Sequence, residues 1–320
     1  MWEVLETAKK VAEKSSQVMI DEQALAQFSQ RFIEKGIKAP SWEESHHFHG
    51  NGEDMVSYLL VLDTVNFCFW PVSGTLRWEI EYRSQKLSGY YALAASLKRA
   101  MEAGLPITRA EYLGRISFEE LKAILGGQGE IQLLEYRLQN LNELGRVLGE
   151  AYSGRADKLV EAAGHSAAAL VRLLAEKLPS FRDVAHYGDD KVFFYKRAQL
   201  FAADLYGAFQ GKEWGEFIDI DKLTAFADYK VPQVLRHLGI LQYTEDLAQK
   251  VDHHILLVAG GPEEVEIRAN TVWAVELIRQ EMSRKGKNVR AFELDWLLWN
   301  LGQQAEFRIR PYHRTVTIFY

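Results

Sequence analysis

The sequence predicts a mostly α-helical protein with a few short β-strands. Leucine recurs at helical spacing along two long stretches, residues 131–152 and 157–178. The connections between patterned stretches are short, and we find no internal repeat, low-complexity segment or linker. The 320 residues, 48% of them hydrophobic, are enough for a large core. We therefore expect residues 1–320 to form one compact unit, built as a single body or as two intimate lobes of about 1–150 and 151–320.

The other elements follow the same periodicities along the chain. Helical patterns cover residues 1–16 and 21–36, and residues 58–70 are almost continuously apolar, as expected of a segment buried on more than one side. Alternation over residues 77–82 predicts a short strand or hairpin. Residues 307–320 alternate in a loosely strand-like way. Further helices are expected at residues 89–102, 109–113, 118–125, 192–209, 240–254, 265–282 and 292–299.

The charge balance restricts the class of partner. The formal net charge is -6, and no run of Lys and Arg is present. Proteins that bind a nucleic-acid polymer usually carry a basic face, because phosphate neutralisation dominates their affinity. The acidic net charge therefore disfavours intact nucleic acid as the substrate and is compatible with a nucleotide substrate. The one cysteine, Cys68, excludes an internal disulfide and a four-cysteine zinc site, and its apolar surroundings indicate a core residue.

No targeting or membrane signal is visible. Residues 1–16 lack the apolar core of a signal peptide and the acid-poor character of a transit peptide. The most apolar stretch, residues 58–70, contains Asp63 and Asn66 and is too short to span a bilayer. We expect a cytoplasmic protein without a membrane partner.

Three histidines lie close together in a polar loop over residues 42–54. His46, His47 and His49 invite a metal interpretation, but no His-Glu-x-x-His helix is present and the nearby acids have no established ligand geometry. We therefore expect no metal. A surface loop and ligand recognition both remain open for these residues.

Asp228 lies at a joint between two expected short helices. Asp219 and Asp221 offer N-cap oxygens for a first helix that would run to Phe226. Pro232 suits the first turn of a second helix, and Gly239 would end it. Asp228 would then lie near the positive end of the second helix, which favours its ionised form. The local pattern by itself favours a capping role for Asp228 over a catalytic one.

Two further groups of charges stand out. Asp63 lies in an apolar stretch and would share a helical face with Asn66. Since burying a carboxylate without a partner is expensive, either a donor inside the protein or a cationic ligand must satisfy Asp63. The C-terminal tail is basic, and its cluster suits either a phosphate or a solvated edge strand. This cluster consists of Arg308, Arg310, His313 and Arg314.

Lys196 and Arg197 form an adjacent cationic pair in an otherwise apolar helix. Long cations are seldom buried unpaired. Both residues could simply satisfy Asp183 or Asp204. Alternatively, Lys196 could lie beside Asp228 and hold that carboxylate ionised.

Four motifs resemble those of the queuosine salvage proteins, the queuosine 5'-phosphate N-glycosylase/hydrolases. They occur in the order of that family and span the chain from about residue 45 to the C-terminus. Two departures, Cys68 in place of Ser and Lys230 in place of Arg, spare the acid Asp228. The motifs are LDTVNFCFW at residues 62–70, FYKRAQ at 194–199, EVEIR at 264–268 and FADYKVPQ at 226–233.

The resemblance implies a compact helical fold similar to the helix-hairpin-helix DNA glycosylases, with Asp228 in the corresponding catalytic place. It implies hydrolysis of queuosine 5'-monophosphate to queuine and ribose 5-phosphate, without a cofactor. Cleavage of the C1'–N bond builds positive charge on the sugar. Asp228 would stabilise that charge, orient a water molecule or attack C1'. Lys196 would be its partner.

Queuine carries a secondary ammonium, a diol and a deazaguanine ring, which call for carboxylates, amides and aromatic rings. A 5'-phosphate calls for cations, for which Arg197, Lys230, His313 and Arg314 are the candidates. Two rival functions remain open, a non-catalytic queuine or nucleoside carrier and a base-excision enzyme acting on DNA or RNA. The expected substrate-binding residues are His49 (with His47 as the alternative), Asp63, Asn66, Phe67, Arg197, Phe226, Tyr229, Gln233, Glu266, Asp295 and Arg314.

Overall fold

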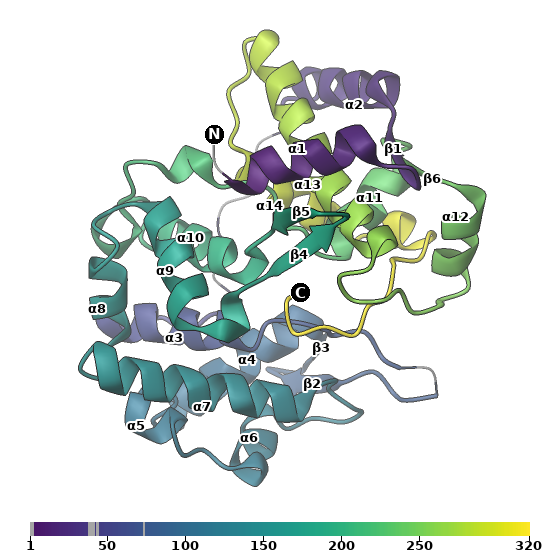
Figure 1. Ribbon diagram of the computed structural model, residues 1–320. Coiled ribbons are helices and arrows are strands. Elements are labelled where there is room, and N and C mark those ends of the chain that lie inside the picture. The colour runs from purple at the N-terminus through teal and green to yellow at the C-terminus, as the bar shows by residue number, and fades with distance from the viewer. Residues whose placement is uncertain (1–2, 38–41, 43–44, 73) are drawn as a thin grey trace.

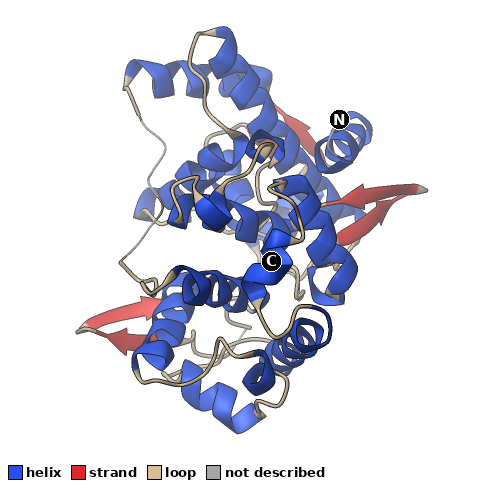
Figure 2. Cartoon of the chain, turned by 90° about the vertical axis from the view of Figure 1, so that its left-hand side faces the viewer, coloured by secondary structure: helices blue, strands red, loops and turns tan. Residues whose placement is uncertain are grey.

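The computed structural model describes residues 3–37, 42, 45–72 and 74–320. Within these residues the chain forms 14 α-helices and three two-stranded sheets, so helices dominate the molecule (Figure 1, Figure 2). The predicted mostly α-helical class with a few short strands is confirmed. The likeness to helix-hairpin-helix DNA glycosylases stays a prediction. No helix in this part of the chain is both long and apolar enough to cross a membrane.

The first half of the chain is helical apart from one short strand and one hairpin. Strand β1 (Val18–Ile20) follows the first helix, and strands β2 (Glu79–Tyr82) and β3 (Gln85–Ser88) form the hairpin that the alternation predicted. The helices of this half are α1 (Glu3–Lys14), α2 (Glu22–Glu34), α3 (Gly52–Thr64), α4 (Gly89–Glu102), α5 (Ala110–Leu113), α6 (Phe118–Leu125) and α7 (Leu134–Ala151).

The second half contains a second hairpin, of β4 (Val184–Tyr187) and β5 (Asp190–Phe193). Strand β6 (Leu241–Tyr243) completes the set of strands. The helices are α8 (Ala156–Glu161), α9 (Ala167–Lys177), α10 (Lys196–Ala208), α11 (Lys230–His237), α12 (Glu245–Asp252), α13 (Pro262–Arg284) and α14 (Ala291–Leu301). Short 3-10 helices are η1 (Pro179–Phe181), η2 (Glu213–Gly215), η3 (Ile220–Lys222) and η4 (Ala305–Arg308).

The N-terminal segment packs on the C-terminal half. Strand β1 pairs antiparallel with β6, so that Val18 faces Tyr243 and Ile20 faces Leu241. Helices α1 and α2 both pack against the long helix α13 (Figure 1). Segments from the two ends of the sequence thereby form one side of the molecule.

Four expected elements are wrong in detail. The single helix over residues 157–178 is divided into α8 and α9, because Gly164 and His165 both adopt a φ of 58°, which an α-helix excludes. The helix over residues 240–254 begins instead as strand β6. The helix expected to end at Phe226 is only the 3-10 turn η3. The tail forms no regular strand among its described residues, although Arg314 makes an isolated bridge with Leu256.

The described residues form two large hydrophobic cores and a small third cluster of Phe67, Cys68 and Trp70. One large core is centred on α3, which packs against α4, α7, α8 and α10. The other large core joins α2, α11, α13 and α14. The apolar stretch of residues 58–70, which forms the second half of α3 and the segment after it, is buried almost throughout, as its composition predicted. The single-unit organisation of residues 1–320 stays a prediction.

Candidate active site

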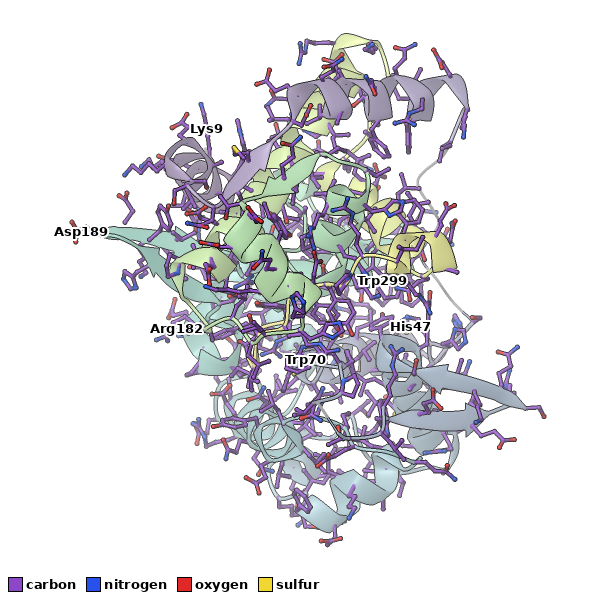
Figure 3. The ribbon with its side chains drawn as sticks, turned by 90° about the vertical axis from the view of Figure 1, so that its right-hand side faces the viewer. Lys9, His47, Trp70, Arg182, Asp189 and Trp299 are labelled. Atoms are coloured by element: carbon purple, nitrogen blue, oxygen red, sulfur yellow. The ribbon has the colours of Figure 1, made fainter. Side chains whose placement is uncertain are left out.

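A cavity of about 420 Å³ lies between elements of the two cores. Its wall comes from the segment after α3, the start of α4, helices α10 and α14, the joint before α11 and the C-terminal tail. Figure 3 labels three wall residues, His47, Trp70 and Trp299, near the middle of the molecule. The predicted site residues that line the cavity are Asn66, Phe67, Lys196, Phe226, Asp228, Tyr229 and Asp295.

Asp228 is held at the start of α11. Its Oδ1 accepts hydrogen bonds from the backbone N–H groups of Lys230 (2.8 Å) and Val231 (2.9 Å), which have no partner within the helix. Burial raises the pKa of Asp228, while the charge of Lys196 and the two N–H groups lower it. The side chain is 8% exposed, on the cavity wall. Asp228 therefore caps a helix and also presents a carboxylate to the cavity.

Lys196 is the first residue of α10 and is 7% exposed. Its backbone N–H donates to Asp183 Oδ2 at 3.1 Å, which fixes the start of the helix. Burial lowers the pKa of Lys196, while the carboxylates of Asp228, then Asp63, raise it. The ammonium therefore lies among acids, with Asp228 as its strongest electrostatic partner.

Two more predicted acids surround this lysine. Asp63 Oδ1 accepts a hydrogen bond from Asn66 Nδ2 at 3.3 Å, and burial raises the pKa of Asp63 to about 7. Asp295 Oδ1 accepts the backbone N–H of Phe226 at 2.8 Å, and burial followed by the charge of Asp228 raises its pKa well above the usual range. Around Lys196 the carboxylates outnumber the cation, and this part of the site suits a cationic ligand.

A second part of the cavity wall, called the cationic end below, carries Lys230, Arg77 and Arg308. The Lys230 ammonium lies 5.1 Å from the centre of the Tyr312 ring. Burial, followed by the charge of Arg308, lowers the pKa of Lys230 to about 8. Lys196 and Lys230 both lower the pKa of Asp228, so this carboxylate is close to the acidic cluster and to the cationic end.

Aromatic rings form the wall near Asp228. The rings of Tyr229 and Tyr312 lie 4.9 Å apart. The Phe67 ring lies 4.3 Å from the guanidinium carbon of Arg137, whose Nη2 donates to the Phe67 carbonyl. Cys68, next to Phe67, is 1% exposed, so its predicted place in the core is confirmed. These rings offer flat surfaces on which a base or sugar can pack.

Two predicted cations lie outside the cavity. Arg197 Nη1 donates to the backbone carbonyls of Asp63 (2.8 Å) and Thr64 (2.5 Å), and Nη2 donates to that of Ser180. Arg197 thus satisfies carbonyl groups. Its guanidinium makes no direct ion pair with Asp183 or Asp204 in the described structure, although burial lowers its pKa and the charge of Asp183 opposes this effect. Arg314 lies over the Trp70 ring, 5.6 Å from its centre.

Glu266 and Gln233 also lie behind the wall. Glu266 Oε2 accepts the backbone N–H groups of Gln17 (2.7 Å) and Val18 (3.0 Å), and Tyr187 donates to Oε1 at 2.7 Å. Gln233 donates to the Arg310 carbonyl at 2.5 Å. Both side chains connect neighbouring segments of the chain, and neither lines the cavity.

Of the clustered histidines, His47 and not His49 lines the cavity. The His47 ring lies 4.4 Å from that of Trp42, and its Nε2 is 3.1 Å from the Tyr90 hydroxyl. Burial lowers the pKa of His47 to about 3, so the ring is neutral. His49 is exposed. Among the described residues, no group of three or more His, Cys, Asp or Glu side chains is arranged to hold a metal.

Sequence reasoning missed several wall residues. Asp204 was considered only as a partner for Lys196 or Arg197, yet it lines the cavity together with Trp42 and Tyr90. A signal was present, because Lys196, Leu200 and Asp204 follow each other at four-residue intervals and form one helical row. Trp42 carried no such signal, since its neighbours come from distant parts of the chain.

Comparison with known proteins shows which family the chain resembles. The family described as "Queuosine salvage protein" matches residues 46–320. A protein of Sphaerobacter thermophilus is 49% identical over 99% of this chain and 97% of its own length. Relatives from Nematostella vectensis and Bos taurus are 36% and 34% identical, each over 98% of this chain and 97% and 98% of their own lengths. All three are named queuosine 5'-phosphate N-glycosylase/hydrolase. This chain belongs to the queuosine salvage protein family.

Proposed function

We propose that this chain is an N-glycosylase that hydrolyses queuosine 5'-monophosphate to queuine and ribose 5-phosphate. The names of its relatives support the reaction class. The observation that carries the proposal is the carboxylate of Asp228, which lies on the cavity wall close to both an acidic cluster and a cationic end. The volume of about 420 Å³ falls within the range of small-molecule sites, about 300–1,000 Å³.

Asp228 stabilises the positive charge that develops at C1' as the base departs. The departing nitrogen keeps the electron pair of the C1'–N bond and takes up a proton, while water supplies the hydroxyl group at C1'. Helix N–H groups fix Asp228 Oδ1, so the carboxylate needs no reorganisation during the reaction. Lys196 opposes the effect of burial on the pKa of Asp228 and so favours the ionised carboxylate.

The order of charges along the cavity matches the order of charges along the nucleotide. The 5'-phosphate lies at the cationic end, near Arg77, Lys230 and Arg308. The ribose lies at Asp228, and the base extends toward the carboxylates beyond Lys196. Of the phosphate candidates expected from the sequence, only Lys230 lines the cavity.

Incubation of the purified protein with queuosine 5'-monophosphate tests this function. We expect queuine and ribose 5-phosphate in equal amounts, separated by chromatography and identified by mass. Tight binding of the nucleotide without release of queuine would contradict the enzymatic function and favour a non-catalytic carrier. Release of a base from oligonucleotides, with none from the mononucleotide, would favour a base-excision enzyme.

A further inference from the structure

Asp204 is a buried carboxylate that has no role in the proposed reaction. It lies on α10, two turns beyond Lys196, lines the cavity and is 2% exposed. Its Oδ1 accepts a hydrogen bond from Trp42 Nε1 at 3.2 Å. Its Oδ2 is buried and has no hydrogen-bond partner among the described residues. A buried oxygen without a partner, on a residue that lines a cavity, is a candidate acceptor for a donor of a ligand.

The surroundings of Asp204 are aromatic. Trp42 stacks obliquely on His47, with ring centres 4.4 Å apart, and His47 in turn contacts the Tyr90 hydroxyl. All three residues line the cavity with Asp204. Aromatic rings beside a carboxylate are a common arrangement for binding alkylammonium groups, because ring faces and the carboxylate both attract the cation.

The positive charge near Asp204 does not compensate for the burial of its carboxylate. Burial, followed by the charge of Asp63, raises the pKa of Asp204 well above its usual range, and only the Trp42 hydrogen bond and Lys196 oppose this. Lys196 itself is held mainly by Asp228 and then Asp63. A second cation from a ligand would satisfy Oδ2 and restore the balance of charge.

We propose that Asp204 is a specificity-determining residue that binds the secondary ammonium of the queuine base through Oδ2. This inference rests on the proposed function for its ligand class. Asp63 suits the role less well because its side chain lies behind the wall, beside Asn66. Asp295 is held by the Phe226 N–H and lies next to Asp228, at the reaction centre.

A thermodynamic cycle on the free base tests this assignment without requiring turnover. The two ligands are queuine and its neutral isostere with an ether oxygen in place of the secondary amine. The two proteins are the wild type and Asp204→Asn, and calorimetry gives four Kd values. We expect the wild type to prefer queuine by about 10- to 100-fold and Asp204→Asn to lose most of this preference.

Two further variants serve as controls. Asp295→Asn removes another cavity acid and should keep the preference for the amine. Asp219→Asn removes an acid that accepts the Ala167 N–H at 2.7 Å outside the cavity, and it should also keep the preference. If Asp204→Asn does not fold, as judged by circular dichroism, Asp204→Ser replaces it.

The outcomes separate this inference from the proposed function. Equal effects of the Asp204 substitution on both ligands, or loss of the preference in Asp295→Asn instead, would overturn the assignment even if the wild type releases queuine. A preference that depends on Asp204 would support the assignment even if the wild type releases nothing.

Discussion

Two buried charge clusters lie close together in this molecule and are satisfied to different extents. In the first, Arg268 donates to both oxygens of Asp183, at 2.9 and 2.6 Å, and lies 3.4 Å from Glu264, which also accepts the Tyr320 hydroxyl at 2.8 Å. In the second, around Lys196, the acids outnumber the cation, and Asp63 and Asp204 each keep an unpartnered oxygen within the described structure. A buried cluster whose groups all have partners stabilises the fold, whereas buried oxygens without partners indicate a place where a ligand can bind.

The clusters are physically joined. Arg268 Nε donates to the carbonyl of Ala227 at 2.9 Å, directly before Asp228. The Arg268 guanidinium carbon also lies 3.9 Å from the centre of the Phe194 ring, two residues before Lys196. The satisfied cluster thus positions the backbone that carries the two proposed catalytic groups.

The largest effect on stability is expected from Arg268→Met. The substitution leaves Asp183 and Glu264 buried without their cation, which typically destabilises a protein by about 3–5 kcal/mol. Urea unfolding followed by circular dichroism measures the change. Asp204→Asn is the matched substitution in the other cluster and should cost less than about 1 kcal/mol, because Oδ2 has no partner to lose. Equal losses of unfolding free energy in the two variants would contradict the view that only the Arg268 cluster stabilises the fold.

An effect on turnover is expected from Lys196→Met. Without the ammonium, burial raises the pKa of Asp228 further, so less of the carboxylate is ionised at neutral pH. We expect kcat to fall about 100-fold at pH 7. Because the acid must lose its proton to work, the rising limb of the pH–rate profile should move to higher pH, and part of the activity should return on alkalinisation. A uniform loss at every pH would instead indicate a purely structural role.

A smaller effect is expected from Lys230→Met at the cationic end. The ratio of kcat/KM for nucleotide over nucleoside should fall about tenfold, as for the loss of one charge-assisted contact. In the wild type the same preference should weaken above pH 8, because the pKa of Lys230 is about 8 and deprotonation removes its charge. Steady-state kinetics on both substrates measure the ratio. An unchanged ratio in the variant would place the phosphate elsewhere.

The sequence predicted those parts of the site that depend on neighbouring residues. The start of α11 near Pro232 follows from local rules, and the capping of its first N–H groups by Asp228 agrees with the expected cap. Lys196 and Asp228 were paired on the basis of the family resemblance. The electrostatic coupling between them is consistent with that pairing, while their catalytic roles stay predictions.

The other features of the site and the fold depend on packing between segments that are distant in the sequence. Glu266 belongs to the same motif as Glu264 and Arg268, but a residue two positions away points to another face of the helix, here toward β1. Asp204 faces the cavity because α10 packs on α3, and Trp42 Nε1 donates to its Oδ1 from a distant part of the chain. Gly164 and His165 divide a helix that the leucine pattern would have continued, since that pattern reports burial and carries no information on φ.

The turnover of Asp228→Asn tests the central claim most directly. Asparagine keeps Oδ1 as an acceptor for the Lys230 and Val231 N–H groups, so the helix start is retained and only the charge is lost. We predict a kcat for queuosine 5'-monophosphate about 10³-fold below wild type, with the Kd for queuine unchanged within about threefold. Asp219→Asn is the control, because Asp219 accepts the Ala167 N–H at 2.7 Å outside the cavity, and it should turn over normally. Turnover by Asp228→Asn within tenfold of wild type would contradict the account and leave Asp228 as a helix cap.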